Sequence, residues 1–186
     1  MASYPRHELE EMVRRFVAAN DEAGTSHAWS KLGDFYTEDA VYSWNVGPRM
    51  EFVARGREEI RETVFGTEMA GLEKWTYPYV KVLIDDAKGE VIGIWRQIAP
   101  VPGQDGKPLE IAGTGGSWFK YGGDYQWRWQ RDFFDFANAA AAFAAMAKAG
   151  RLSEAMQERL RSAGRPRGWV PRETFDWYSS IPGDDE

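Results

Sequence analysis

The segment 127–136 alternates large aromatic residues with charged and polar ones at the period of two that is typical of a β-strand. Strict alternation predicts one face that carries Trp127, Trp129, Arg131 and Phe133. It predicts a second face that carries Arg128, Gln130, Asp132 and Phe134. A carboxylate is thereby placed among aromatic rings, which costs free energy unless it is paired, hydrogen-bonded or used in chemistry. The fold must therefore provide a strand with two occupied faces.

Helical periodicity dominates the part of the chain that comes first. Apolar residues at helical spacing predict a helix over about 7–20. Thr25 or Ser26 can cap a second helix, which ends before a short strand over 40–45. A third short helix opens at 56–60, where acidic residues in its first turn suit the helix dipole.

The middle of the chain changes to strand periodicity. It predicts long strands over about 73–85, 90–99, 109–121 and 125–136, with a loop over 100–108. Helices followed by an antiparallel meander predict an α+β domain whose sheet wraps around its helices.

The composition changes again after residue 136. An alanine-rich helix over 137–149 and a further helix over about 153–163 precede a tail that is rich in aromatic residues. The sequence therefore predicts a domain over 1–136 and a C-terminal helical and aromatic extension over 137–186 that packs on it. We expect this aromatic-rich C-terminal segment to dock across the mouth of a cavity or onto a neighbouring subunit.

Composition limits the classes of function. The net charge of -6 without a long basic block argues against a nucleic-acid partner. The absence of Cys and the presence of only two His, His7 and His27, argue against a metal site, and we predict no cofactor. Neither a signal pattern nor a membrane-length apolar run is present, so we expect a cytoplasmic protein with no membrane partner.

Three segments carry a resemblance to a known family: Phe35–Tyr42, Gly56–Ile60 and Arg131–Asp135. Together with the order of the predicted elements, they resemble the SnoaL-like branch of the nuclear transport factor 2-like superfamily over about 8–136. The resemblance implies a cone-shaped α+β fold with a strongly bent antiparallel sheet around an apolar cavity, often dimeric. Relatives include polyketide cyclases, ketosteroid isomerases, limonene epoxide hydrolases, scytalone dehydratases and noncatalytic binding modules, so the fold leaves the function open.

The resemblance places Asp132 where epoxide hydrolases hold a water-activating carboxylate and where cyclases hold a general acid or base. Tyr42 matches the water-positioning tyrosine of the epoxide hydrolases, but Trp44 replaces their asparagine unless Asn45 substitutes for it. Arg96 matches their pocket arginine, whereas Ile98 replaces the aspartate two residues on.

Two other active sites of the family are incomplete in this chain. The carboxylate base of the ketosteroid isomerases would fall near Trp44, and no acid lies between Ala40 and Pro48. The histidine pair of the scytalone dehydratases cannot be assembled from His7 and His27.

We therefore take Asp132, Arg96, Tyr42 and His27 as candidate catalytic residues. Asp132 would move a proton next to a carbonyl or activate water, with Arg96 as its charge partner and Tyr42 or Arg96 as donor to the oxyanion. A buried Arg–Asp pair that only satisfies itself is the structural alternative. His27 could shuttle protons or simply lie at the surface or cap a helix.

Four further residues are candidate ligand contacts: Trp44, Trp118, Gln130 and Trp29. Ordinary core packing is an equal explanation for such aromatic residues. The predicted ligand is a hydrophobic small molecule.

Three classes of function remain. The first is cofactor-independent acid–base catalysis by a lyase, isomerase, cyclase or hydrolase on a hydrophobic carbonyl compound. The second is a noncatalytic binding or interaction module of the same fold. The third is an accessory subunit of a ring-hydroxylating oxygenase.

We also expect a homodimer that covers the face of Trp127, Trp129 and Phe133, because that face would form a large apolar patch.

Overall fold

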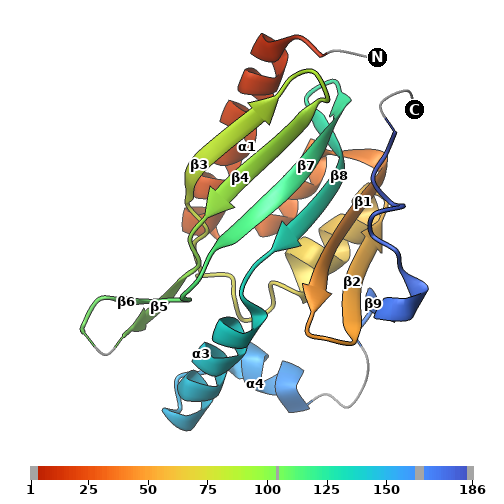
Figure 1. Cartoon of the computed structure of the whole chain (residues 1–186). Coiled ribbons are helices and arrows are strands. Elements are labelled where there is room, and N and C mark those ends of the chain that lie inside the picture. The colour runs from red at the N-terminus through yellow and green to blue at the C-terminus, as the bar shows by residue number, and fades with distance from the viewer. Residues whose placement is uncertain (1–3, 104, 162–165, 184–186) are drawn as a thin grey trace.

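The computed structural model describes residues 4–103, 105–161 and 166–183. One long helix lies behind a curved sheet, and two shorter helices lie at one end of the molecule (Figure 1). The helical elements are α1 (Arg6–Ser26), the 3-10 helix η1 (Trp29–Phe35), α2 (Arg57–Glu59), the π-helix η2 (Ile60–Thr67), α3 (Phe136–Lys148), α4 (Glu154–Arg161) and the 3-10 helix η3 (Arg172–Thr174). The strands are β1 (Tyr36–Val46), β2 (Met50–Arg55), β3 (Tyr79–Asp85), β4 (Glu90–Trp95), β5 (Ile98–Pro102), β6 (Pro108–Glu110), β7 (Gly115–Gly123), β8 (Gln126–Phe133) and β9 (Trp169–Pro171).

Helix α1 forms where its apolar stripe predicts it and buries Leu9, Met12 and Phe16 against the sheet. It ends at His27, which adopts a left-handed backbone with a φ of 63° and whose N–H donates to Ala23 O at 2.8 Å. The predicted second α-helix is instead the short 3-10 helix η1, and Tyr36 already belongs to β1.

The main sheet has seven strands in the order β3-β4-β7-β8-β1-β2-β9. The antiparallel sheet predicted from the sequence is wrong at one place, because β1 and β8 pair in parallel. The strand β1 is joined to β2 by a hairpin, and the meander that starts at β3 returns through β8 running in the same direction as β1. The predicted loop over 100–108 contains parts of a second, two-stranded sheet of β5 and β6. Strand β2 was not predicted from the sequence.

A bulge in β8 overturns the strict alternation predicted for this strand. Lys120 pairs with Trp129 and Tyr121 pairs with Trp127, so the register between β7 and β8 shifts by one residue at Arg128. Because of this shift, Trp127 does not share a face with Trp129.

The two faces of the sheet therefore differ in what covers them. On the inner face, which packs against α1, Trp127 contacts the rings of Phe16 and Phe119. Gln130 and Asp132 lie on this same face, because their cross-strand partners Phe119 and Ser117 alternate with the outward Trp118. Trp118, Trp129 and Phe133 belong to the outer face.

The outer face is covered in part by residues 172–183, which we call the tail. Trp177 packs edge-on against Trp118, with ring centroids 6.4 Å apart. Trp129 is fully buried, and its Nε1 donates to Ser180 Oγ at 3.1 Å. The tail therefore lies on the face opposite Asp132, and it occupies much of the surface on which we expected a second subunit.

A smaller hydrophobic cluster lies beside the main core. It joins α3 and α4 to the loop before β3 and to β5, through Trp75, Ala99, Ile111, Ala139, Met146 and Met156. Trp75 and Phe143 have ring centroids 5.4 Å apart. Within the described residues, no helix is long and apolar enough to cross a membrane.

Truncation after Pro171 should lower the melting temperature without changing any activity of the inner face. The tail covers Trp129, and exposing one large apolar side chain costs about 3 kcal/mol, or about 6–12 °C for a chain of this size. Differential scanning calorimetry measures the loss. An unchanged melting temperature would contradict the packing role of the tail.

Candidate functional site

Asp132 is the centre of a polar cluster on the inner face. Tyr42 Oη donates to Asp132 Oδ2 at 2.7 Å. Ser117 Oγ and Gln130 Nε2 donate to Asp132 Oδ1 at 2.6 and 2.7 Å. Tyr42 comes from β1, Ser117 from β7, and Gln130 from β8 itself, so three neighbouring strands hold the carboxylate. All three donors are neutral.

A second set of hydrogen bonds fixes which atom donates to which. Trp95 Nε1 and Gln130 Nε2 both donate to Ser117 Oγ, at 2.9 and 3.2 Å. Since an indole N–H can only donate, the single hydroxyl hydrogen of Ser117 is directed to Asp132. Tyr36 Oη donates to Gln130 Oε1, which turns the amide nitrogen of Gln130 toward the carboxylate.

These directions make the two oxygens of Asp132 unequal. Oδ1 accepts two hydrogen bonds from groups that are themselves held in place. Oδ2 accepts one, from the phenol of Tyr42. A carboxylate oxygen has two lone pairs, so Oδ2 is the better placed of the two to take up a proton.

Burial sets the electrostatics of the cluster. Burial raises the pKa of Asp132 above its ordinary value, and the hydrogen bonds from Ser117, Tyr42 and Gln130 oppose that shift. Burial, followed by the charge of Asp132, raises the pKa of Tyr36, Tyr42 and Tyr79 as well. The three phenols therefore stay protonated and can act as hydrogen-bond donors.

Arg131, the neighbour of Asp132 in the sequence, does not neutralise it. Its side chain lies on the outer face, where Nη2 is 3.0 Å from Glu51 Oε2 and Nη1 donates to Ser43 Oγ at 3.2 Å. Its charge is the smallest of the causes that act on the pKa of Asp132. No ion pair of Asp132 occurs among the described residues.

The expected pairing of Arg96 with Asp132 is wrong. Arg96 forms a bidentate ion pair with Glu110, with Nε–Oε1 and Nη2–Oε2 distances of 2.8 and 2.5 Å, and its side chain is 50% exposed. Arg96 comes directly after β4, whose last residue Trp95 occupies the inward position. Arg96 is therefore directed to the β5–β6 hairpin rather than to the inner face.

His27, at the end of α1, and Trp29, the first residue of η1, contact the segment before β3 and not the carboxylate. His27 is exposed, and its Nδ1 lies 3.1 Å from Glu73 O. Trp29 is buried and donates from Nε1 to the same carbonyl at 2.8 Å. Both contacts tie the start of η1 to Glu73.

The remaining candidate ligand contacts fall on different faces. Trp44 is half-buried beside the cluster, with its ring stacked on Phe52 at 3.7 Å and edge-on to Tyr42 at 5.7 Å. Gln130 belongs to the cluster itself. Trp118 lies on the outer face against Trp129, so it does not share a surface with Asp132.

Sequence reasoning missed Ser117, Trp95, Tyr36 and Tyr79 as members of the cluster. Ser117 pairs directly with Asp132 across β7 and β8, and its alternation with Trp118 was the available signal. The alternation alone does not show that Ser117 lies opposite Asp132, because this depends on the register between the two strands, which the sequence pattern does not provide.

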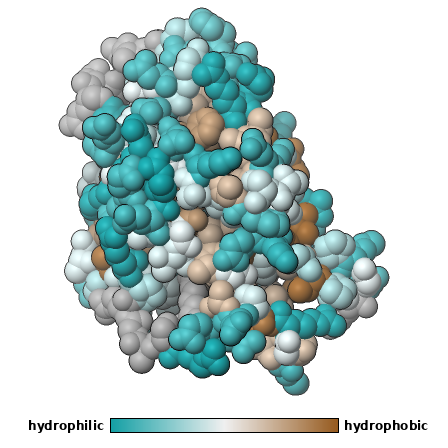
Figure 2. All heavy atoms as spheres, turned by 180° about the vertical axis from the view of Figure 1, so that it is seen from behind, coloured by the Kyte–Doolittle hydropathy of each residue, from teal (hydrophilic) through white to brown (hydrophobic). Residues whose placement is uncertain are grey.

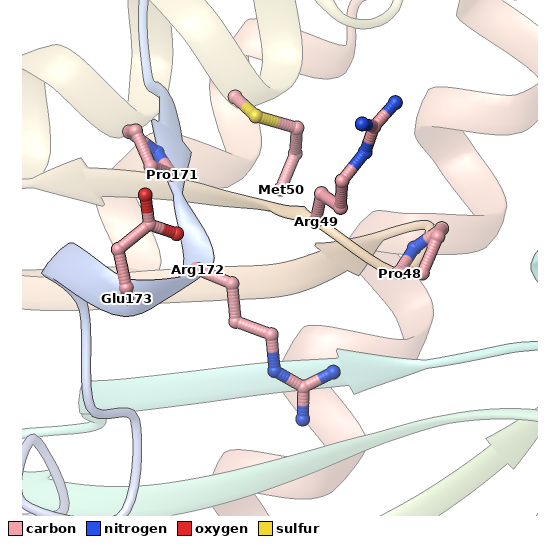
Figure 3. A pocket seen from close by; sticks show the side chains of 6 residues that line it. All are labelled: Pro48, Arg49, Met50, Pro171, Arg172 and Glu173. Carbon is pink, nitrogen blue, oxygen red and sulfur yellow. The ribbon is translucent and has the colours of Figure 1, made fainter.

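Two surface pockets are formed by other parts of the molecule. One, of about 800 Å³, is lined by Pro48, Arg49, Met50, Pro171, Arg172 and Glu173. Figure 3 shows that the side chains of Arg49 and Arg172 point in different directions there. The other lies against α3 and α4. Neither includes a residue of the Asp132 cluster, so an apolar cavity beside Asp132 stays a prediction.

Among the described residues, no group of three His, Asp or Glu side chains is arranged to hold a metal ion. The chemistry that the cluster itself can perform is proton transfer, with one carboxylate as base or acid and phenols as donors.

The pKa of Asp132 should leave a signature in the pH dependence of stability. Because burial raises its folded-state pKa, the folded protein binds this proton more tightly than the unfolded chain does. The stabilising contribution is complete below the unfolded-state pKa, about 4, and is lost as pH rises through the folded-state pKa. The melting temperature of Asp132→Asn relative to the unchanged protein should therefore increase as pH rises through this window. A difference that stays constant with pH would contradict the raised pKa.

Solved structures with a similar fold support the architecture. Bal32a, from a soil-derived mobile gene cassette, is 24% identical, with 72% of this chain and 94% of that chain covered and a TM-score of 0.53. A protein from Jannaschia sp. CCS1 that is proposed to be a SnoaL-like polyketide cyclase is 15% identical, with 73% of this chain and 91% of that chain covered and a TM-score of 0.55. A protein from Shewanella putrefaciens CN-32, which is also proposed to be a SnoaL-like polyketide cyclase, is 16% identical. The match covers 76% of this chain and 88% of that chain, with a TM-score of 0.53.

These likenesses confirm the predicted α+β fold of the nuclear transport factor 2-like type. Among curated proteins, none matches the chain. The model of the SnoaL-like domain matches residues 5–149, a range that runs through α3 and so beyond the predicted boundary at 136. The chain belongs to the SnoaL-like domain family.

Proposed function

We propose that the protein catalyses a cofactor-independent proton transfer on a hydrophobic carbonyl compound, with Asp132 as the general base and acid. The observation that carries the proposal is the environment of its carboxylate. The carboxylate is buried, its pKa is raised, and it accepts hydrogen bonds from the neutral donors of Ser117, Tyr42 and Gln130. Such perturbed groups concentrate at functional sites.

Glu51, on β2, offers a comparison with a structural carboxylate. On the outer face, Glu51 is paired with Arg131, which is the usual way to keep a buried carboxylate ionised. Asp132 has no such cation among the described residues. A buried carboxylate that is not neutralised costs stability, and retaining it is reasonable if the proton it exchanges is used.

The geometry favours Asp132 Oδ2 as the reacting atom. Oδ2 would remove the proton from the carbon next to the carbonyl, forming an O–H bond as the C–H bond breaks. The electron pair of that C–H bond forms the carbon–carbon double bond of the enolate, and the π pair of the carbonyl moves to its oxygen. Once Oδ2 carries the proton, it no longer needs the hydrogen bond from Tyr42, and that phenol can donate to the enolate oxygen. Asp132 then returns the proton to carbon.

Ser117 and Gln130 are positioning residues in this scheme. They hold Oδ1 in both protonation states and so keep Oδ2 directed to the substrate. The half-buried ring of Trp44, next to Tyr42, is the proposed apolar contact for the substrate. Isomerase, cyclase and lyase reactions all share the enolate step, and the substrate determines which of them follows.

Deuterium exchange tests the enolate step without knowledge of the natural substrate. The protein is incubated in D2O with 2-tetralone, a flat apolar ketone with acidic protons next to its carbonyl, and exchange is followed by mass spectrometry. We expect exchange above the buffer rate, with a rate that rises with pH through the raised pKa of Asp132. Binding of 2-tetralone without exchange would favour a noncatalytic binding module instead.

A further inference from the structure

Strand β3 is an open edge of the main sheet. It is the first strand in the sheet order, and no described element continues the sheet beyond it (Figure 1). Val82 and Ile84 face inward and pack on the core, while Val80 and Leu83 are 58% and 55% exposed. In the reversed view of Figure 2, hydrophobic atoms gather along the right-hand border, the side on which β3 lies.

The opposite edge of the sheet, strand β9, has a sequence that prevents a further strand from pairing with it. Strand β9 has three residues and ends in Pro171, which cannot donate a backbone hydrogen bond. The chain then enters the 3-10 helix η3. Strand β3, with seven residues and no proline, lacks this protection, and an exposed edge of that length is a template for another strand.

The outward side of β3 is self-complementary in charge. Lys81, Leu83 and Asp85 alternate with the inward residues and are all exposed. Lys81 and Asp85 have opposite charges and lie symmetrically on either side of Leu83. No ion pair involves the Lys81 or Asp85 side chain within the described part of the chain.

We infer that β3 pairs antiparallel with β3 of a second copy of this chain, with the two-fold axis at Leu83. In a symmetric antiparallel pair, opposite residues must point to the same face, so the axis has to pass midway between one residue and the same residue of the second copy. An axis at Leu83 places Lys81 opposite Asp85 of the second copy and Asp85 opposite Lys81 of the second copy. The two exposed leucine side chains then meet between these ion pairs.

The neighbouring registers are less favourable. An axis at Lys81 would place the two lysines opposite each other, and an axis at Asp85 would do the same for the two aspartates. Like charges directly opposite each other destabilise a strand pair, whereas opposite charges and apolar pairs stabilise it. An axis at Val82 or Ile84 would place Leu83 opposite Lys81 or Asp85 and leave no Lys–Asp pair.

This interface is independent of the proposed catalysis and differs from the dimer expected from the sequence. The tail already packs on the outer face, around Trp118 and Trp129. Pairing through β3 leaves both the tail and the Asp132 cluster in place, because it uses the edge of the sheet rather than either face.

Charge reversal at β3 tests the inference directly. The association of the full chain is measured by sedimentation equilibrium for the unchanged protein, Lys81→Asp, Asp85→Lys and the double variant. Each single reversal turns two attractive pairs into two repulsive ones, so we expect the dimer dissociation constant to rise about tenfold or more. The double variant exchanges the charges and should restore dimerisation. Lys107→Asp, on the β5–β6 hairpin, is the matched control and should leave the constant unchanged.

The possible results separate the interfaces. An unchanged protein that stays monomeric at high micromolar concentration overturns the inference. A dimer that neither single reversal weakens also overturns it and assigns association to another surface, such as the exposed Phe133 and Tyr178. Weakening by both single reversals without recovery in the double variant contradicts the register at Leu83. Circular dichroism of each variant establishes that it remains folded.

Discussion

Asp132→Asn should abolish the deuterium exchange of 2-tetralone while the protein stays folded. A positioned acid–base group contributes about 100- to 10,000-fold in rate, so exchange should fall to near the buffer rate. Asparagine keeps an acceptor oxygen for Ser117 and Gln130 at the place of Oδ1. Its amide nitrogen can donate to the phenol oxygen of Tyr42, which turns to accept. The cluster is therefore retained, and the proton-accepting atom is lost.

The matched control is Asp105→Asn, which removes the same charge from the exposed β5–β6 hairpin. We expect this variant to catalyse the deuterium exchange of 2-tetralone at the same rate as the protein without substitutions. If Asp132→Asn keeps the full rate of exchange and loses several degrees of melting temperature, the carboxylate has a structural role. In that case the protein is better regarded as a binding module.

The position of Asp132 was predictable from its own strand. Its place among aromatic residues at a period of two indicated an inward carboxylate, and the structure confirms that it lies on the inner face with Gln130, two residues away. Helix α1 was predictable in the same way, from a local apolar stripe. Tyr42 was identified through the family resemblance, and the structure places its hydroxyl 2.7 Å from the carboxylate.

The errors come from information that is not local. The bulge at Arg128 reverses the side to which Trp127 points, and a single inserted residue leaves no mark in the alternation. Ser117 and Trp95 join the cluster through strand register, which depends on pairing across the sheet. Arg96 was assigned to Asp132 because it was the best available cation, whereas the nearby hairpin carries Glu110.

The parallel pairing in the main sheet and the position of the tail also depend on contacts between distant parts of the chain. Local pattern predicted the strands of the meander, but the parallel contact of β1 with β8 depends on the path of the whole chain. The aromatic residues of the tail indicated packing, but which face it covers is decided by the contacts of Trp177 and Ser180 with β7 and β8.

Arg131→Met should be the most destabilising single change on the outer face. Glu51 is 1% exposed, and its Oε2 accepts from Arg131 Nη2 at 3.0 Å. The guanidinium carbon also lies 4.6 Å from the ring centroid of Trp177, so the same side chain helps to hold the tail. Removing one member of a buried pair leaves an uncompensated charge and costs about 3–5 kcal/mol. Thermal denaturation should show a loss of about 6–20 °C for a chain of this size.

The double variant Arg131→Met, Glu51→Leu separates the two causes of that loss. Replacing both members of a buried pair by apolar residues is often neutral or stabilising. Glu51 Oε1 has no hydrogen-bond partner among the described residues, so the pair is incompletely satisfied and little is lost with it. We therefore expect the double variant to recover most of the melting temperature. If it is as unstable as Arg131→Met, the stability comes from the packing of Arg131 on Trp177 and its hydrogen bond to Ser43 rather than from the charge of Glu51. Exchange of 2-tetralone should persist in the double variant, because Asp132 lies on the other face.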